Sequence, residues 1–241
     1  MLVEATSNIA LINLLCVVWF LVAWVGYSYF AKTMAKRTMS LSSVLHIHRE
    51  DWMRSLLQRD MRVSDAALVA NLERHVTFFA STTILILAGL LAVIPNIGLL
   101  HKLLSGLPII EQVSEAELQL RIVLLVCVFV YAFFTFTWSM RQYGFCSILV
   151  GAAPLPDDKS ETAITRETYA RHAAKVIDQA GHSYNYGLRA YYFAMSVLAW
   201  FIHPWLFIGA VTLVVAILYR REFYSKPVKA MIEIAKHKVE N

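Results

Sequence analysis

The sequence has few charges, few cysteines and none of the short motifs that usually carry enzyme chemistry. Only 16% of its 241 residues are charged, whereas soluble domains contain about one quarter. Hydrophobic residues make up 58% of the chain, and they gather in runs long enough to cross a bilayer. The shortage of charge therefore excludes an ordinary soluble domain and indicates an integral membrane protein.

The three cysteines exclude a disulfide framework. Cys16 and Cys127 fall within hydrophobic runs, and Cys146 lies roughly 28 Å from Cys127 along one expected helix. A disulfide cannot bridge that distance. We expect the cysteines to be small, buried hydrophobic residues in a reducing compartment.

Signatures of catalysis and cofactor binding are also missing. The sequence contains no glycine-rich dinucleotide fingerprint, no phosphate-binding loop, no His-Glu-x-x-His pair and no nucleophile elbow. Its histidines fall outside the hydrophobic runs or near their ends, which argues against haem. His46 and His48 could contribute to a metal site with His172 and His182, but such pairs usually lack the remaining ligands. We predict no enzyme activity, no cofactor and no bound metal.

What the sequence does contain is a series of hydrophobic windows. The first, Ile9 to Phe30, is long enough for a retained helix rather than a signal peptide. The last two are separated by His203 and Pro204, and one helix across both would measure roughly 45 Å, well beyond a hydrocarbon core of about 30 Å. The fold class expected is a single all-α transmembrane domain over residues 1–241, with five spans near residues 9–30, 76–94, 122–140, 184–202 and 205–219.

Lysine and arginine are concentrated in every second connection between these windows. They are frequent after the first window, after the third and in the C-terminal tail, whereas residues 95–121 contain only Lys102 and Arg121. Because basic residues stay in the cytosol, the N-terminus is expected outside and the C-terminus inside. That orientation requires an odd number of crossings and favours five over four, in what we expect to be a bacterial inner membrane.

The formal net charge of +5 has the same explanation. The bases cluster at expected cytosolic helix ends, where anionic lipid headgroups attract them. The bilayer, rather than a nucleic acid, is therefore the expected polyanionic partner.

Two stretches outside the spans have one apolar face and predict cytosolic helices, near residues 44–62 and 161–180. Gly181 stands where a glycine commonly ends a helix. Trp52 and Tyr169 lie on the apolar faces. These faces either pack against the inner ends of the spans or contact lipid or a protein partner.

Local signals also mark the connections. Residues 99–104 form a short apolar stretch that predicts an interfacial helix, broken by Gly106 and Pro108. Ser114 followed by Glu117 matches a capping box and predicts that the third long helix begins there. The segment GAAPLPDD at residues 151–158 predicts a linker after that helix, because proline does not continue a helix.

The candidate functional residues are polar groups at helix ends. Arg74, Arg141 and Arg189 each occupy the expected cytosolic end of a different span. They either extend to phosphate headgroups or converge into an anion-binding mouth, since guanidinium presents a planar fork of donors. Glu73 could neutralise such a cluster.

The second span adds His75, Ser81 and Thr82 near one helical face. These residues could line a hydrated path, or they could serve the close helix contacts that small and hydroxyl residues usually mediate in membranes. No acidic residue lies deep within a span, which favours an anion or a neutral solute over a proton or a cation.

Five sequence blocks carry a family resemblance. They are HREDWM (48–53), FFASTTILILAGL (78–90), YAFFTFTWSMRQYGFCSILVGAAP (131–154), GLRAYYFAMSVLAWFIHPWLF (187–207) and LYRREFYSK (218–226). In these blocks the chain resembles the family called domain of unknown function 599, multi-span membrane proteins of bacteria and plants. The resemblance implies a helical membrane fold and includes Arg141 and Arg189, but it implies no activity.

Two functional classes follow. The first is a small channel or carrier for an anion or another small solute, assembled as a homo-oligomer because five short spans leave little room for a pore. The second is a scaffold or accessory subunit that docks a protein partner through its cytosolic helices. A pathway predicts a continuous polar lumen at the axis of an oligomer, whereas a scaffold predicts a dry, filled bundle with an exposed apolar side.

Overall fold

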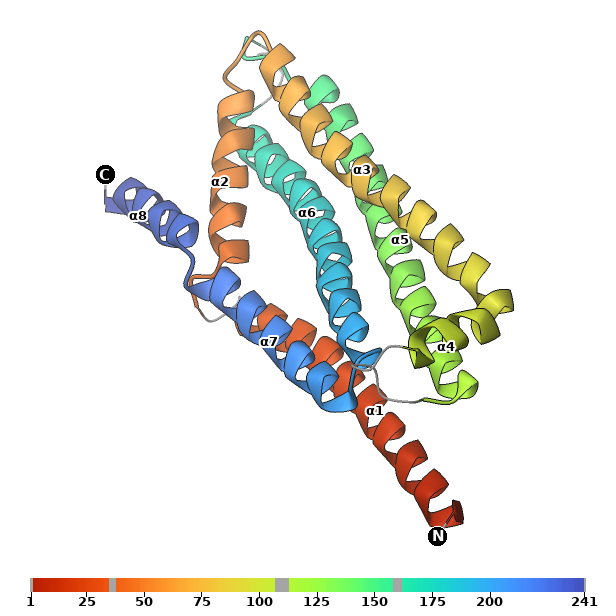
Figure 1. The fold of residues 1–241 in the computed structure, drawn as a ribbon. Helices are drawn as coiled ribbons and strands as arrows, with labels where there is room; N and C mark the ends of the chain where they lie inside the picture. Colours follow the sequence, from red (N-terminus) through yellow and green to blue (C-terminus); the bar gives the residue numbers. More distant parts are fainter. Residues whose placement is uncertain (1, 35–37, 107–112, 158–161, 241) are drawn as a thin grey trace.

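The computed structural model describes residues 2–34, 38–106, 113–157 and 162–240, and within these ranges it is helical, without a strand (Figure 1). Its elements are α1 (Leu2–Met34), α2 (Leu41–Leu56), α3 (Val63–Val93), the 3-10 helix η1 (Ile94–Asn96), α4 (Ile97–Ser105), α5 (Glu115–Ala152), α6 (Ala163–Trp200), α7 (Pro204–Phe223) and α8 (Lys226–Glu240). The all-α class predicted from the sequence is confirmed.

The long helices form a bundle in which direction alternates along the chain (Figure 1). Helices α1, α5 and α7 run one way, and α3 and α6 run the other way. Helix α5 packs between α3 and α6, α7 packs on α1 and α6, and α2 lies along the first half of α6. We call the end of the bundle that carries α2 and α8 the α2 end, and the opposite end the α4 end.

Three described segments are long and apolar enough to cross a membrane: Leu11–Met34, Val63–Ser105 and Glu115–Ala152. They identify the chain as a membrane protein. Helices α5 and α6 contain 38 residues each and are therefore roughly 57 Å long, about twice the hydrocarbon thickness. A helix of this length would extend well beyond any bilayer that it crosses. The predicted spans at residues 184–202 and 205–219 are not among the three segments, so the count of five is not confirmed.

Local signals located several element ends correctly. Helix α5 starts at a capping box, in which the Ser114 hydroxyl accepts from the Glu117 backbone N–H at 3.3 Å and the Glu117 carboxylate accepts from the Ser114 N–H at 2.7 Å. The apolar stretch after the second span forms α4, while Pro108 lies outside the described residues. A short turn ends α6 and starts α7 at Pro204.

Two helix ends were predicted wrongly. Gly181 does not end a helix, because α6 is continuous from Ala163 to Trp200 and joins the predicted cytosolic helix to the predicted fourth span. Helix α2 ends at Leu56 rather than near residue 62. The chain turns back there because Trp52 and Arg59 both donate to the buried carboxylate of Asp65 on α3, at 2.7 and 2.6 Å.

Aromatic side chains fill the bundle interior. Phe79 stacks on Phe136 with ring centroids 5.5 Å apart, and Trp200 stacks on Phe207 at 4.8 Å nearer the α4 end. Such pairs combine large apolar burial with specific ring geometry. Cys16 and Cys146 are buried as expected, but Cys127 is exposed on α5, so the prediction of burial was wrong for that residue.

Candidate functional site

A hollow of about 680 Å³, most of whose lining residues have polar side chains, opens where the ends of α1 and α7 meet the start of α2. Helices α5 and α6 form its other walls. We call it the inner cavity. Its polar lining includes Lys32, Ser42, Ser43, His46, Gln142, Asp178, His182, Ser183, Asn185, Arg189 and Glu222.

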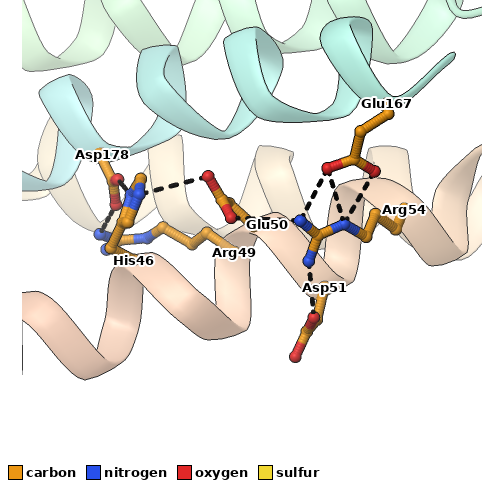
Figure 2. Close-up of polar contacts among 7 residues, drawn as sticks. All are labelled: His46, Arg49, Glu50, Asp51, Arg54, Glu167 and Asp178. Carbon is orange, nitrogen blue, oxygen red and sulfur yellow. Dashed lines mark hydrogen bonds and ion pairs between the residues drawn. The ribbon is translucent and has the colours of Figure 1, made fainter. Parts of the chain in front are cut away.

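Asp178 joins α6 to α2 at one side of the inner cavity (Figure 2). Its carboxylate accepts a hydrogen bond from Arg49 Nη1 at 2.6 Å and contacts His46 Nδ1. His46 Nε2 lies 3.3 Å from a Glu50 carboxylate oxygen. The carboxylate of Asp178 is thus neutralised by side chains from α2.

Gly181 makes this contact possible. A Cβ at residue 181 would lie 2.7 Å from Arg49 Nη2, a distance too short for non-bonded atoms. The absent side chain lets the guanidinium cross α6 and reach Asp178, one turn earlier in the helix. The glycine therefore serves a close contact between helices, which explains why it does not end α6.

A second ion pair lies further along the same two helices (Figure 2). Arg54 Nη2 is 2.8 Å from Glu167 Oε1, and both side chains are exposed to solvent. The hydrogen bond between them raises the pKa of Arg54 and lowers the pKa of Glu167 relative to their usual values. Exposed pairs of this kind contribute little stability.

Glu222 joins three helices at the opposite side of the cavity. Its carboxylate lies 3.6 Å from Arg189 Nη2 on α6, and it accepts from the Ser42 backbone N–H at 3.3 Å in the first turn of α2. The Arg189 guanidinium is 5.4 Å from the ring of Tyr27 and 5.7 Å from that of Tyr186. Arg189 is therefore held by a carboxylate and by two aromatic rings.

Apart from Lys32, the remaining residues of the cavity wall are uncharged. The Ser183 hydroxyl donates to the Gln179 carbonyl at 2.9 Å and is hydrogen-bonded to the Gln142 side-chain amide at 2.8 Å, which links α6 to α5. Burial lowers the pKa of His182 below its usual value, so a neutral imidazole faces the cavity at pH 7. Lys32 is exposed at the end of α1 and makes no ion pair with any described residue.

The three arginines predicted to form one mouth do not converge. Arg189 lines the inner cavity, and Arg141 lines a separate hollow on the outer face of α5 together with Glu73. Arg74 is exposed on α3 and, in the part of the chain that the structure describes, lines neither hollow. The charge pattern predicted neither the direction in which each one faces nor its level along the bundle. Ser139 bonds the Ala180 carbonyl, whereas Gly187 packs on Phe136, so Arg189 lies nearer the α4 end than Arg141.

The other candidates on α3 do not line the inner cavity either. His75 and Ser81 are exposed, and the Thr82 hydroxyl donates to the Phe78 carbonyl at 2.8 Å. The hydroxyl that faces the interior belongs to Thr83, which is buried and lies 2.8 Å from the Tyr191 hydroxyl.

Trp52 and Tyr169 make their polar contacts within the chain. Trp52 bonds Asp65 as described above, and the Tyr169 hydroxyl donates to the Leu149 carbonyl at 2.6 Å. Both are half-buried. Their placement matches packing on the inner ends of the long helices, and partner docking through them stays a prediction.

Sequence reasoning missed the acidic residues that organise the site. A signal was present for Asp178, because it follows Ala174 by four residues and so shares the apolar face of its helix. A carboxylate on an apolar face requires a partner when it is buried. No comparable signal marks Glu222, whose partners come from distant helices.

The buried Arg121 was missed as well. Its side chain is 1% exposed at the α4 end, donates to the Trp200 carbonyl at 2.7 Å and lies 5.2 Å from the Trp200 ring. It binds one of the last carbonyls of α6, which have no partner within the helix. Arg121 therefore fixes the end of α6 beside the start of α5.

The histidine pair does not form a metal centre. His48 Nε2 lies 3.3 Å from the Met231 carbonyl on α8, whereas His46 contacts Asp178. Among the described residues, no group of three or more histidine, cysteine or carboxylate side chains is arranged to hold a metal ion.

A known protein family matches most of the chain. A model of the family described as "Protein of unknown function, DUF599" matches residues 15–227. The chain belongs to the DUF599 family. The matched region spans every helix that lines the inner cavity, so the DUF599 match covers the candidate site as a whole. No curated protein and no solved structure matches the chain.

Proposed function

We propose that this DUF599 protein is a five-span carrier of the bacterial inner membrane that accepts a small anionic solute into the inner cavity from the cytosol. The α2 end is the cytosolic end in this proposal, because the basic connections and the basic tail meet there. The N-terminus is then outside and the C-terminus inside.

The observation that carries the proposal is the inner cavity with Arg189 fixed in its wall. A volume of about 680 Å³ lies within the range of small-molecule sites, roughly 300–1,000 Å³. The acidic lining residues already have cationic partners, Asp178 in Arg49 and Glu222 in Arg189. Lys32 makes no ion pair with a described residue, so its ammonium gives the cavity a positive charge that can bind an anion.

The filled interior favours a carrier over an open channel within one chain. Beyond the cavity, the ring of Phe193 packs edge-on against Phe20 with centroids 5.7 Å apart. The ring of Phe207 stacks on Phe20 with centroids 5.9 Å apart. Passage to the outer side would require these helices to move apart. The cavity therefore corresponds to an inward-facing binding site.

Uptake into liposomes tests the proposal. Purified protein is reconstituted and assayed with labelled chloride, inorganic phosphate and succinate. We expect uptake of at least one of these anions above that of empty vesicles, and we expect Arg189→Gln to reduce it about tenfold or more, since hydrogen bonds to charged groups contribute about 1.5–3 kcal/mol.

Arg74→Gln is the matched control, because Arg74 is exposed on α3 and, among the described residues, lines neither hollow. We expect its uptake to equal that of the wild type. Equal losses in both variants would argue for a general charge effect. Wild-type flux no greater than that of empty vesicles would remove the carrier proposal.

A second candidate function, a scaffold, has its own support at the tip of the α2 end. Arg62 donates to the Pro154 carbonyl at 2.5 Å, which joins the two tip loops, and Arg166 on α6 donates to the Leu155 carbonyl at 2.5 Å. Around them Met61, Leu155 and Ile164 are exposed by 79%, 59% and 80%. A fixed surface with large exposed apolar groups suits a protein partner.

Chemical cross-linking in native membranes distinguishes the scaffold. A cytosolic partner that docks at the tip should be cross-linked to the wild type and lost in Ile164→Asp, with anion uptake unchanged. A cross-linked partner retained in Ile164→Asp would contradict docking at this surface.

A further inference from the structure

The outward face of α5 carries a second hollow, also of about 680 Å³, which we call the outer groove. Phe134 and Trp138 line one half, and Phe145 and Ile148 line the other. Phe134 is 64% exposed and Ile148 is 68% exposed. The groove is thus a long apolar surface that no described part of this chain covers.

The outer groove extends past the edge of the hydrocarbon core. The charge-free run at residues 122–140 ends at Arg141 and is roughly 28 Å long as a helix, which matches the core thickness. Phe145 and Ile148 then lie about 6 and 10 Å beyond Arg141 along α5. Acyl chains can cover Phe134 and Trp138, but water would contact the rest.

The groove also carries one charge of each sign. Glu73 on α3 and Arg141 on α5 both line it, and neither forms an ion pair within the described residues. A two-fold interface brings one patch against an identical patch. A patch with both charges is self-complementary, because Glu73 of each copy can face Arg141 of the other.

Gly144 supplies a third observation. It lies within α5, where glycine costs about 1 kcal/mol relative to alanine, yet a Cβ there would meet no described atom within 4 Å. Contacts within the chain therefore do not require a glycine. The absence of a side chain at this position allows a second helix to pack closely against the groove, since small residues permit close approach in membranes.

We propose that two copies of this chain pair through their outer grooves, α5 against α5, about a two-fold axis parallel to the membrane normal. Glu73 of one copy faces Arg141 of the other, and the apolar side chains beyond the lipid edge are covered by protein. The inference uses the bilayer placement given above, but it does not depend on transport.

Pairing also bears on the inner cavity. Trp138 lines both hollows, so it forms part of the wall between the dimer interface and the cavity. A second copy against the outer groove would hold this side chain in place.

The charge pair provides the first test. Purified protein is reconstituted in nanodiscs, and the number of copies per disc is counted by single-molecule photobleaching. Wild type should be dimeric. Glu73→Arg and Arg141→Glu should each weaken the dimer about tenfold or more, because each change places like charges opposite one another, and the double variant Glu73→Arg/Arg141→Glu should restore it.

Cross-linking locates the interface independently. In a Cys127→Ser background, Ile148→Cys should form a disulfide between copies under mild oxidation. Ile164→Cys is the control, since Ile164 is exposed but lies outside the groove. Both variants are checked by thermal unfolding, so that a failure to link is not a failure to fold.

Three results would overturn the proposal. One is a monomeric wild type. Another is a dimer whose stability is unchanged by both charge reversals and which forms no disulfide through Ile148→Cys. The third is a monomer that co-purifies with phospholipid and loses it in Arg141→Glu, which would assign the groove to a lipid. None of these results depends on anion uptake.

Discussion

Asp178 illustrates how one carboxylate can organise an end of the bundle. It is 7% exposed and lies among apolar residues of α6, so its charge requires compensation. Arg49 and His46 from α2 supply it (Figure 2). The same carboxylate therefore attaches α2 to α6 and forms part of the cavity wall.

Asp178→Asn should destabilise the protein markedly, because it leaves the partly buried Arg49 without a counter-charge. Hydrogen bonds to charged groups contribute about 1.5–3 kcal/mol, and we expect a loss in that range, measured as a lower midpoint of thermal unfolding in detergent. Glu167→Gln is the control, since it breaks an exposed pair and should change the midpoint very little. Equal effects of the two variants would contradict a special role for Asp178.

At the scale of elements, α6 shows which features could be predicted from the sequence and which could not. Signals within a few residues were read correctly, such as the Ser114 capping box and the turn before Pro204. Gly181 was misread because its role depends on Arg49, which lies far away in the sequence. The cavity was missed for the same reason, since the carboxylate that holds Arg189 comes from α7.

Gly187 gives the element-scale prediction. A Cβ there would lie 2.5 Å from the Phe136 ring, so α5 and α6 can approach at this level only without a side chain. Gly187→Ala should destabilise the bundle by about 1–3 kcal/mol, the usual cost of overpacking.

Gly209→Ala on α7 is the matched comparison, because a Cβ there would meet no described atom within 4 Å. Alanine should stabilise that helix by up to about 1 kcal/mol. Thermal unfolding of both variants measures the difference. If Gly187→Ala stabilised the protein, the Phe136 ring would be able to move aside at little cost, which would contradict the prediction.

On the scale of the whole molecule, contacts at the two ends of the bundle fix the relative levels of the helices. Arg121, near the start of α5, bonds the last carbonyl of α6 at 2.7 Å. Glu222, at the end of α7, contacts Arg189 and the start of α2. If α5 crosses the bilayer, then α6 returns across it and α7 crosses again. Five crossings stay a prediction, for which these contacts are an argument separate from charge sorting.

Cysteine labelling in intact cells tests this topology. In a Cys127→Ser background, Trp205→Cys reports on the turn between α6 and α7, and Ile164→Cys reports on the start of α6; the two native side chains are 69% and 80% exposed. A membrane-impermeant maleimide should label Trp205→Cys in intact cells and Ile164→Cys only after permeabilisation, because the outer and inner ends of one helix face different compartments. Labelling of both variants only after permeabilisation would keep α6 and α7 on the cytosolic side and reduce the crossings to three. The inner cavity would then have no route to the outer face, and a carrier function would lose its physical basis even if the cavity bound an anion.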